Sequence, residues 1–449
     1  MIGPGTLDRL RAASPYNVVR LILPADTPGG GAPGDGARGD GAPGDGAPGD
    51  GAAADRVAPR SAGEIAAARL RGWLAEGALT VDGAPALYVY EQRASDWVQR
   101  GLIGLVAVGT DAVHPHEGVM PGPVAGRREL MMATRSNLEP ILLVYNSGAR
   151  AGGHGDPAGL APGGRDPAGP DLAGPDLAGP DPAGRGAASR LVDRTADGQA
   201  PLAWTETDDG ITHRLWAVTD PAAQAAVAAD LATRTALIAD GHHRYAAYRE
   251  LQAEMRAAGA GDGPWDYGLA FLVDADAYPL ILGPIHRVLP GLDPAEAARR
   301  AAAAFTVTPV PGDVAVDRLA AAGETGAAFL LAGRDGCWLL TEPDQRQIAA
   351  AMPADASPRW QALDASVMRE LLLRQLWSIK DNEHDVLISH DAAEAVRMAA
   401  DAGGTAVICN PMPLAAVMDI AAHGEQVPRK STSFGPKPRT GLVLRTFDA

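Results

Sequence analysis

Residues 235–255 read TALIADGHHRYAAYRELQAEM, and the change of pattern within this stretch decides the fold. Thr235–Ala239 is a short apolar run of strand length, whereas His243–Met255 has the composition and spacing of a helix. Asp240 and Gly241 break the apolar run between the two segments. The stretch therefore predicts a strand that leads through a tight turn into a helix.

The turn carries residues that suit an anion-binding site. Backbone N–H groups at a helix N-terminus are unpaired, and the helix dipole adds partial positive charge there. Gly241 lets the backbone approach a ligand closely, and Arg244 offers a planar guanidinium suited to phosphate oxygens. His242 and His243 add donors whose ordinary pKa lies near neutral pH. We predict that these four residues hold phosphate; the alternative is a tight turn with polar side chains facing solvent.

Strand and helix patterns alternate on both sides of this stretch. Apolar runs predict strands, and amphipathic runs that follow an N-cap residue predict helices. The predicted strands are residues 16–23, 86–90, 103–108, 141–145, 235–239, 269–273, 280–282, 328–331, 337–340 and 405–409, and the predicted helices are 61–76, 127–136, 221–233, 243–255, 294–304, 364–377 and 392–400. This alternation indicates an α/β or α+β architecture. A new cycle begins after Pro290, so we predict two regions, residues 1–290 and 291–449.

Two low-complexity tracts interrupt the pattern. Residues 27–55 repeat Gly-Ala-Pro-Gly-Asp, and residues 148–186 repeat Asp-Leu-Ala-Gly-Pro. Both tracts lack the large apolar side chains that offset the entropy of ordering, so we predict disordered insertions, with partner-binding arms as the alternative. Patterned sequence on either side favours insertions into one continuing unit over linkers between domains.

Composition narrows the class of protein. The chain has 449 residues, a formal net charge of −16 and two cysteines, Cys337 and Cys409. Two cysteines cannot build a disulfide framework, and no stretch reaches the roughly 18–20 apolar residues that span a bilayer. The acidic balance disfavours a nucleic-acid partner, since phosphate neutralisation needs a basic surface. We therefore expect a cytoplasmic protein that uses neither a membrane nor nucleic acid.

A second candidate site is the run His114-Pro115-His116-Glu117. Transfer of a group to a hydroxyl needs a base on that hydroxyl, and we assign this role to Glu117, with His116 as its neighbour. The alternative is a polar loop after a strand. Two histidines and a carboxylate are common by chance, so we predict no dedicated metal site. Mg²⁺ that arrives with a nucleotide needs only one or two carboxylates, which Glu117 and Asp240 can supply.

The third candidate is the basic segment near the C-terminus. Lys430, Ser431, Thr432 and Lys437 combine cations with hydroxyls and suit an anion, although a solvated basic tail is the alternative. The segment is not a Walker A loop, because Arg429 stands where the second glycine should be. The pair His286 and Arg287, after the predicted strand 280–282, is a further candidate for a substrate contact.

Several blocks of this sequence resemble one family. They are SPYNVVRLILP at 14–24, HPHEGVMPGP at 114–123, RSNLEPILLVYN at 135–146, ADGHHRYAAY at 239–248, LGPIHRVLP at 282–290 and VPRKSTSFGPKPRTGLV at 427–443. In this order they resemble the blocks of the domain-of-unknown-function 1015 family. The resemblance covers nearly the whole chain except the two low-complexity tracts.

The resemblance implies a nucleotide site at the turn. The motif is similar to the phosphate-binding turn of ParB-like proteins and sulfiredoxins, which makes Gly241, His242, His243 and Arg244 the phosphate cradle and implies a ParB/sulfiredoxin-like core. His242 stands where sulfiredoxin has its cysteine, which disfavours sulfinic-acid repair. ParB-like segregation needs a DNA-binding helix-turn-helix, for which the sequence has no basic candidate.

Three functions remain open from the sequence. Archaeal free-serine kinases carry a similar turn, so the resemblance implies a phosphotransferase that uses ATP or ADP with Mg²⁺ on free serine or a related small hydroxyl-bearing metabolite. The alternative is a ParB-like nucleotide-binding regulatory protein that has no metabolite kinase activity. A third hypothesis is another enzyme of phosphorylated metabolites, such as a phosphatase.

Overall fold

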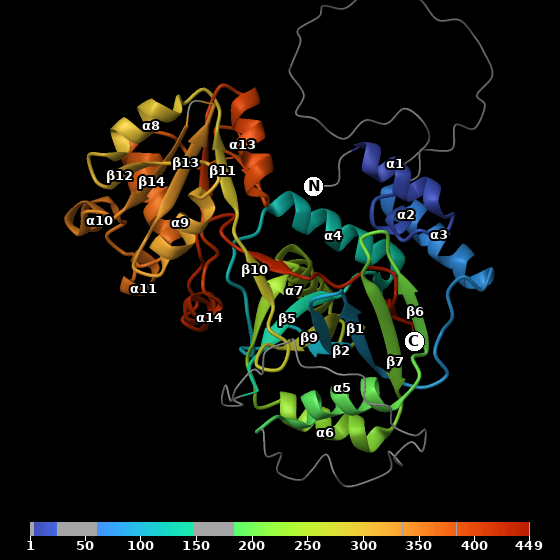
Figure 1. Ribbon diagram of the computed structural model, residues 1–449. Coiled ribbons are helices and arrows are strands. Elements are labelled where there is room, and N and C mark those ends of the chain that lie inside the picture. Colours follow the sequence, from blue (N-terminus) through green and yellow to red (C-terminus); the bar gives the residue numbers. More distant parts are fainter. Residues whose placement is uncertain (1–3, 25–60, 148–183, 335, 383, 449) are drawn as a thin grey trace, which may run out of the picture.

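A computed structural model describes residues 4–24, 61–147, 184–334, 336–382 and 384–448. These residues form a mixed α/β fold built on an eight-stranded sheet and a six-stranded sheet (Figure 1). The predicted low-complexity insertions lie outside the described residues, apart from residues 184–186. None of the described helices is long and apolar enough to span a membrane.

The eight-stranded sheet has the order β3-β8-β5-β9-β2-β1-β7-β6. Its neighbouring strands pair antiparallel except for β3 with β8 and β5 with β9, which pair parallel. The strands are β1 (Leu87–Arg93), β2 (Val98–Ala107), β3 (Val113–His114), β5 (Ile141–Tyr145), β6 (Ala203–Glu206), β7 (Thr212–Val218), β8 (Ala236–Asp240) and β9 (Tyr267–Asp274).

Apolar residues cover both faces of this sheet, because successive side chains of a strand point to opposite faces. On β5, Ile141 and Leu143 join a core with four helices, whereas Leu142 and Val144 join a second core on the opposite face. The four helices are α4 (Pro121–Thr134), α5 (Ala187–Gly198), α6 (Pro221–Leu231) and α7 (His242–Ala257). The second core contains α14 (Leu414–Ala422), which lies 140 or more residues after every strand of the sheet.

The strand, turn and helix predicted at residues 235–255 are confirmed. β8 ends at Asp240, Gly241 has a left-handed conformation with φ of 97°, and α7 begins at His242. The predicted helix at 61–76 is confirmed as α3 (Ala62–Ala75), with a capping box in which the side chain of Ser61 accepts from the amide of Glu64.

The six-stranded sheet is antiparallel throughout, in the order β12-β14-β13-β16-β11-β15. Its strands are β11 (His286–Leu289), β12 (Thr306–Val310), β13 (Phe329–Gly333), β14 (Gly336–Thr341), β15 (Leu387–Ser389) and β16 (Thr405–Cys409). Helices α8 (Pro294–Ala301), α9 (Ala315–Gly323), α10 (Gln345–Ala351), α11 (Pro358–Gln361), α12 (Asp364–Val367) and α13 (Ala392–Asp401) accompany it. α12 continues into a π-helix at Met368–Leu376.

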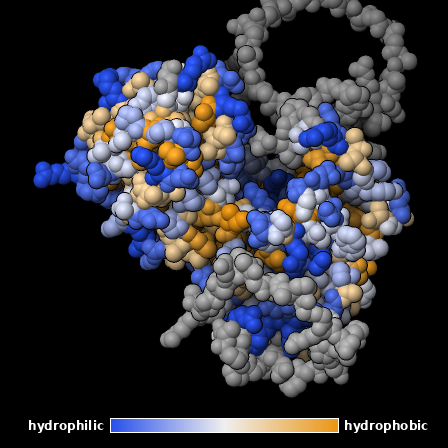
Figure 2. All heavy atoms as spheres, viewed as in Figure 1, coloured by the Kyte–Doolittle hydropathy of each residue, from blue (hydrophilic) through white to orange (hydrophobic). Residues whose placement is uncertain are grey.

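The end of the chain returns to the first sheet. β17 (Ser433–Gly435) pairs with β10 (Ile281–Gly283), and β18 (Arg445–Thr446) pairs with β4 (Ser136–Asn137). Hydrophobic residues gather on the surface near β10 and α14, where the two sheets adjoin (Figure 2). The boundary near Pro290 stays a prediction, although β11 just before it already belongs to the second sheet.

One predicted strand is wrong. Residues 16–23 do not form a strand; they contain the short helix α2 (Val19–Ile22), which follows α1 (Pro4–Ala13). The side chain of Asn17 accepts a hydrogen bond from the amide of Val19, and this local bond favours a helical turn over extended backbone. Val19 and Leu21 are buried by this turn, so the apolar residues that suggested a strand serve a helix instead.

A buried histidine anchors the C-terminal segment to the first sheet. Nδ1 of His213 lies 2.8 Å from the hydroxyl of Tyr90, and its Nε2 lies 3.3 Å from Nε of Arg439. The amide of Arg439 also donates to the Tyr90 hydroxyl. Burial first, and then the charge of Arg439, lower the pKa of His213 from 6.5 to about 4. The imidazole is therefore neutral in the folded protein at neutral pH.

This pKa predicts an acid-sensitive contribution to stability. The folded pKa of His213 is below the unfolded one, so its contribution is complete above pH 6.5 and is lost as the pH falls through about 4. Over this window the free energy of unfolding of the wild type should fall more steeply than that of His213→Gln, by up to about 1.4 kcal/mol per pH unit. Denaturant unfolding at several pH values measures the difference, and parallel curves would contradict it.

Candidate functional site

The N-terminus of α7 has free backbone donors. No side chain caps the helix, and the first hydrogen bond into it runs from the amide of Tyr245 to the carbonyl of Gly241, at 2.9 Å. The amides of His242, His243 and Arg244 consequently have no hydrogen-bond partner among the described residues. Three donors at the positive end of a 16-residue helix suit an anion.

Asp240 lies beside these donors and is held by two cations. Its Oδ2 accepts from Nη2 of Arg244 at 2.6 Å, and its Oδ1 pairs with Nζ of Lys437 at 2.7 Å. Burial raises the pKa of Asp240, but the charges of Arg244 and Lys437 lower it further, so the net pKa lies below its ordinary value. The carboxylate is ionised at neutral pH. Its contact with Lys437 brings the predicted basic tail to the predicted turn.

Arg244 is occupied by the protein itself. Besides Asp240, its Nη1 donates to the carbonyl of Pro140 at 2.7 Å and lies 3.4 Å from Oε2 of Glu139. Only Nε has no hydrogen-bond partner among the described residues. The guanidinium thus fixes the end of β8 against the start of β5. Its predicted role as a phosphate ligand stays a prediction, and it has less free donor capacity than the sequence alone indicated.

His242 and His116 form a buried pair that reaches the C-terminal segment. Nε2 of His242 lies 3.3 Å from Nδ1 of His116, and Nε2 of His116 lies 2.9 Å from Oγ1 of Thr432. Burial lowers the pKa of His242 to about 3 and that of His116 to about 4. Both rings are therefore neutral at neutral pH, whereas the sequence suggested that the charge of His242 responds near neutral pH. They act here as hydrogen-bonding groups that connect α7 with residue 432.

Glu117 and His243 complete the group around the helix start. Oε1 of Glu117 accepts from the amide of Lys430 at 3.3 Å, and Lys430 has a left-handed φ of 54°. Nε2 of His243 accepts from the amide of Met120, and burial first lowers the pKa of His243, against the opposing charge of Glu117. The structure thus brings together residues from three distant segments: Glu117 and His116, Asp240 to Arg244, and Lys430, Thr432 and Lys437.

Three predicted contacts lie beside this group rather than in it. His286 is buried on β11 and accepts from the amide of Cys409 at 3.2 Å. Arg287 donates to the carbonyl of Arg429, and Ser431 donates to the carbonyl of Pro428 at 2.6 Å. Arg287 and Ser431 line a pocket of about 410 Å³ at the edge of the second sheet. Sequence analysis missed Glu139, whose only signal was its place in the block at 135–146.

Two carboxylates could hold a metal ion that arrives with a ligand. The described part of the chain contains no group of three or more His, Cys, Asp or Glu side chains placed for a metal. Asp240 and Glu117 would have to be completed by oxygens of the ligand, as is common for Mg²⁺.

Gly241 is required by both conformation and space. Its φ of 97° is strained for other residues, and a methyl group added there would lie 2.8 Å from Cγ2 of Ile141. Gly259, at the other end of α7, has a φ of 81° but open space around it. We expect Gly259→Ala to cost about 1 kcal/mol of stability and Gly241→Ala about 2–3 kcal/mol, because only the second adds a clash. Equal losses in denaturant unfolding would show that the contact with Ile141 relaxes freely.

Fold and site together define a mixed α/β protein in which an uncapped helix N-terminus adjoins Asp240, Glu117 and the C-terminal segment. The family model described as "Protein of unknown function (DUF1015)" matches residues 49–152 and 180–366. The chain belongs to this family, as the sequence blocks predicted.

Comparison with solved structures gives distant similarities. A free serine kinase variant in complex with AMP is 13% identical with a TM-score of 0.33, and the match covers 79% of this chain and 92% of that chain. A conserved hypothetical protein from Pyrococcus furiosus is also 13% identical, with a TM-score of 0.32 and coverage of 75% and 92%. C-terminally truncated SbnI from Staphylococcus aureus is 10% identical, with a TM-score of 0.36 and coverage of 77% and 87%. No curated protein sequence matched the chain.

Proposed function

We propose that the chain transfers a phosphoryl group from ATP or ADP to the hydroxyl of a small metabolite. The observation that carries this proposal is the uncapped start of α7, which has two carboxylates and two lysines around it. The three free amides would bind the phosphate oxygens of the nucleotide, and Lys430 and Lys437 would offset the remaining negative charge. The carboxylate of Glu117 has no cation in ion-pair contact among the described residues, and this favours chemistry over anion binding alone.

Glu117 is the proposed base. The acceptor hydroxyl would form a bond to the terminal phosphorus as its proton passes to Glu117, and the bond from phosphorus to the nucleotide's bridging oxygen would break. The contact from the Lys430 amide uses one oxygen of Glu117, and the other oxygen has no hydrogen-bond partner among the described residues. Asp240 is less suited to the role, because Arg244 and Lys437 occupy both of its oxygens and keep its pKa low.

Mg²⁺ is the proposed partner of the nucleotide. When bound, it would neutralise phosphate charge, with Asp240 and Glu117 as the residues available to hold it. The neutral pair His116 and His242 would position the site, since it fixes Thr432 and with it the segment that contains Lys430.

The acceptor we propose is free L-serine or a related hydroxy amino acid, which is what the sequence resemblance implies. Purified protein should be incubated with ATP or ADP, Mg²⁺ and pooled amino acids, and the products analysed by mass spectrometry. A phosphorylated amino acid formed only with active protein is the expected result. Nucleotide binding in calorimetry without any product would instead support the regulatory, ParB-like alternative.

A further inference from the structure

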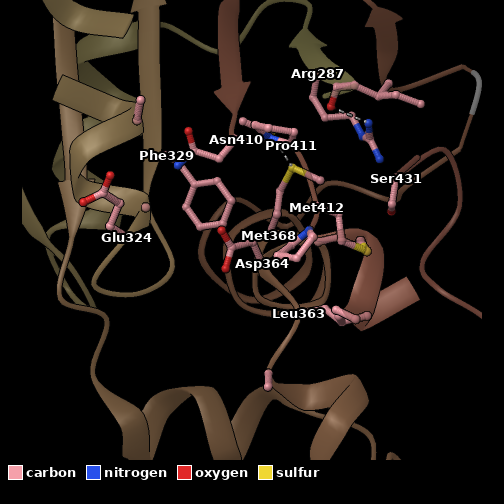
Figure 3. A pocket seen from close by; sticks show the side chains of 18 residues that line it. Arg287, Glu324, Phe329, Leu363, Asp364, Met368, Asn410, Pro411, Met412 and Ser431 are labelled. Carbon is pink, nitrogen blue, oxygen red and sulfur yellow. Dashed lines mark hydrogen bonds between the residues drawn. The ribbon is translucent and has the colours of Figure 1, made fainter. Parts of the chain in front are cut away.

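A second cavity, separate from the start of α7, lies at the edge of the six-stranded sheet. It has a volume of about 410 Å³, and side chains from α9, α12 and α14 enclose it together with the ends of β13 and β16 (Figure 3). Apolar residues form most of its wall, including Phe329, Met368 and Met412. A cavity of this size and lining is typical of small-molecule sites. Its charged residues are Arg287, Asp364 and Glu324.

Arg287 is a buried cation with no carboxylate in ion-pair contact among the described residues, although Asp381 and Glu117 act on its charge from a longer distance. Its side chain is 1% exposed, and it forms no ion pair with the residues that the structure describes. Its two hydrogen bonds are to neutral carbonyls, those of Ile285 at 3.2 Å and Arg429 at 2.9 Å, and its Nε is buried with no hydrogen-bond partner in the described part of the chain. An unpaired buried charge is costly, and an anion beside the guanidinium would offset that cost.

Asp364 is the corresponding unpaired anion. It begins α12 and has no hydrogen-bond or ion-pair partner among the described residues. Burial alone raises the pKa of its carboxyl to about 6. Figure 3 shows Asp364 and Arg287 on different sides of the pocket, with Met368 between them. The pocket therefore has a cationic side, an apolar middle and an acidic side.

The backbone beside Asp364 is also unusual. α12 continues into the π-helix Met368–Leu376, in which the amide of Trp377 bonds to the carbonyl of Leu372, five residues earlier. Extra residues in a helix turn displace side chains from their normal positions, and π-helical turns are frequent at functional sites. Here the first residue of the π-helix, Met368, lies in the pocket wall.

We propose that this pocket binds a small, elongated carboxylic acid. The carboxylate would pair with Arg287, the aliphatic body would lie against Phe329, Met368 and Met412, and an amine at the far end would pair with Asp364. Neither charge has an ion-pair partner among the described residues, and one zwitterionic ligand would supply both partners. This site does not depend on the proposed phosphoryl transfer.

The pocket is connected to Glu117 through one peptide group. Arg287 donates to the carbonyl of Arg429, and the amide of the next residue, Lys430, donates to Glu117. The carbonyl of Arg429 and the amide of Lys430 belong to one peptide group and point in opposite directions when the peptide is trans. Arg287 and Glu117 therefore bond to opposite edges of the same peptide. Their bonding atoms are no more than about 9 Å apart. A ligand carboxylate that draws Arg287 away from the carbonyl of Arg429 would therefore alter the position of Glu117. Only this effect on Glu117 rests on the proposed phosphoryl transfer.

Calorimetry with four probes tests the site. They are 6-aminohexanoate, hexanoate, hexanamide and hexyl phosphate, each titrated into the full chain without nucleotide. We expect 6-aminohexanoate to bind more tightly than hexanoate, and hexanoate at least tenfold more tightly than the neutral hexanamide, because each end of the ligand forms a charge-assisted contact. Binding of hexyl phosphate alone would overturn the proposal of a carboxylate ligand. Equal affinity for hexanoate and hexanamide would overturn the role of Arg287.

Two variants assign the ends of the ligand. Arg287→Met keeps an unbranched apolar stem but removes the guanidinium, and it should weaken hexanoate binding about tenfold to a hundredfold. Asp364→Asn should retain hexanoate binding and lose the advantage of 6-aminohexanoate. Arg300→Met, on the exposed face of α8, is the control and should change neither. If Arg287→Met does not fold, the affinities of the four probes for the wild type still decide whether the pocket binds a carboxylate. A separate measurement of nucleotide affinity tests the proposed site at α7, so a failure of that site can be distinguished from a failure of the pocket.

Discussion

Replacing Glu117 with glutamine should reduce turnover by about a hundredfold or more while nucleotide affinity changes little. Glutamine keeps the size of the side chain and can still accept from the amide of Lys430, so the local structure should survive. It cannot take a proton from an acceptor hydroxyl. A residue that acts in the transition state affects turnover more than ground-state binding.

The same variant separates this role from two others. If Glu117 mainly holds Mg²⁺, nucleotide binding should weaken in the presence of the metal and not in its absence. If Glu117 only fixes Lys430, turnover should survive and the melting temperature should fall slightly. Glu129→Gln, on the exposed face of α4, is a suitable control for the loss of one negative charge. Near-normal turnover in a folded Glu117→Gln protein would remove this residue from the site.

Local sequence predicted the part of the site that is local in the chain. The spacing of apolar residues changes at Gly241, and this change predicts the strand β8, the turn and the helix α7. Strands, turns and helix starts can be predicted in this way because they depend on residues close in sequence. The same rule failed at residues 16–23. There the apolar spacing fits a strand, but the bond from the Val19 amide to the Asn17 side chain and burial against α3 favour a helix.

Contacts between distant segments could not be read from periodicity. Thr432 meets His116 across 316 residues, and Lys437 meets Asp240 across nearly 200. Blocks of sequence suggested that the tail returns to the turn, but not which atoms meet. The low pKa values of His116 and His242 depend on burial, to which the tail contributes at His116 through Thr432 and Phe434, so they could not be read from local sequence either. The pocket beside Arg287 is formed by α9, α12 and α14, which no local motif connects.

Arg244→Ala should lower both stability and nucleotide affinity. The guanidinium bonds to Asp240 and the carbonyl of Pro140 and lies close to Glu139, so its loss leaves partly buried acceptors unpaired. Removal of one partner of such a pair should cost about 3 kcal/mol of stability. Nucleotide affinity should fall by about tenfold to a hundredfold, either because a phosphate contact is lost or because Asp240 moves.

A matched ion pair elsewhere separates the two effects. Arg234 bonds to Asp230 at 2.6 Å, also four residues apart and similarly buried. Its other bonds are to the carbonyls of Asn146 and Ser147, which are not part of the proposed site. Arg234→Ala should therefore reduce stability by a similar amount and leave nucleotide affinity unchanged. A double-mutant cycle with Asp240→Asn then identifies how Arg244 acts. If Arg244 acts only by holding Asp240, the double variant should bind nucleotide no more weakly than the weaker single variant. If Arg244 also contacts phosphate through its free Nε, the losses in affinity should add, and unchanged affinity in folded Arg244→Ala would exclude both roles.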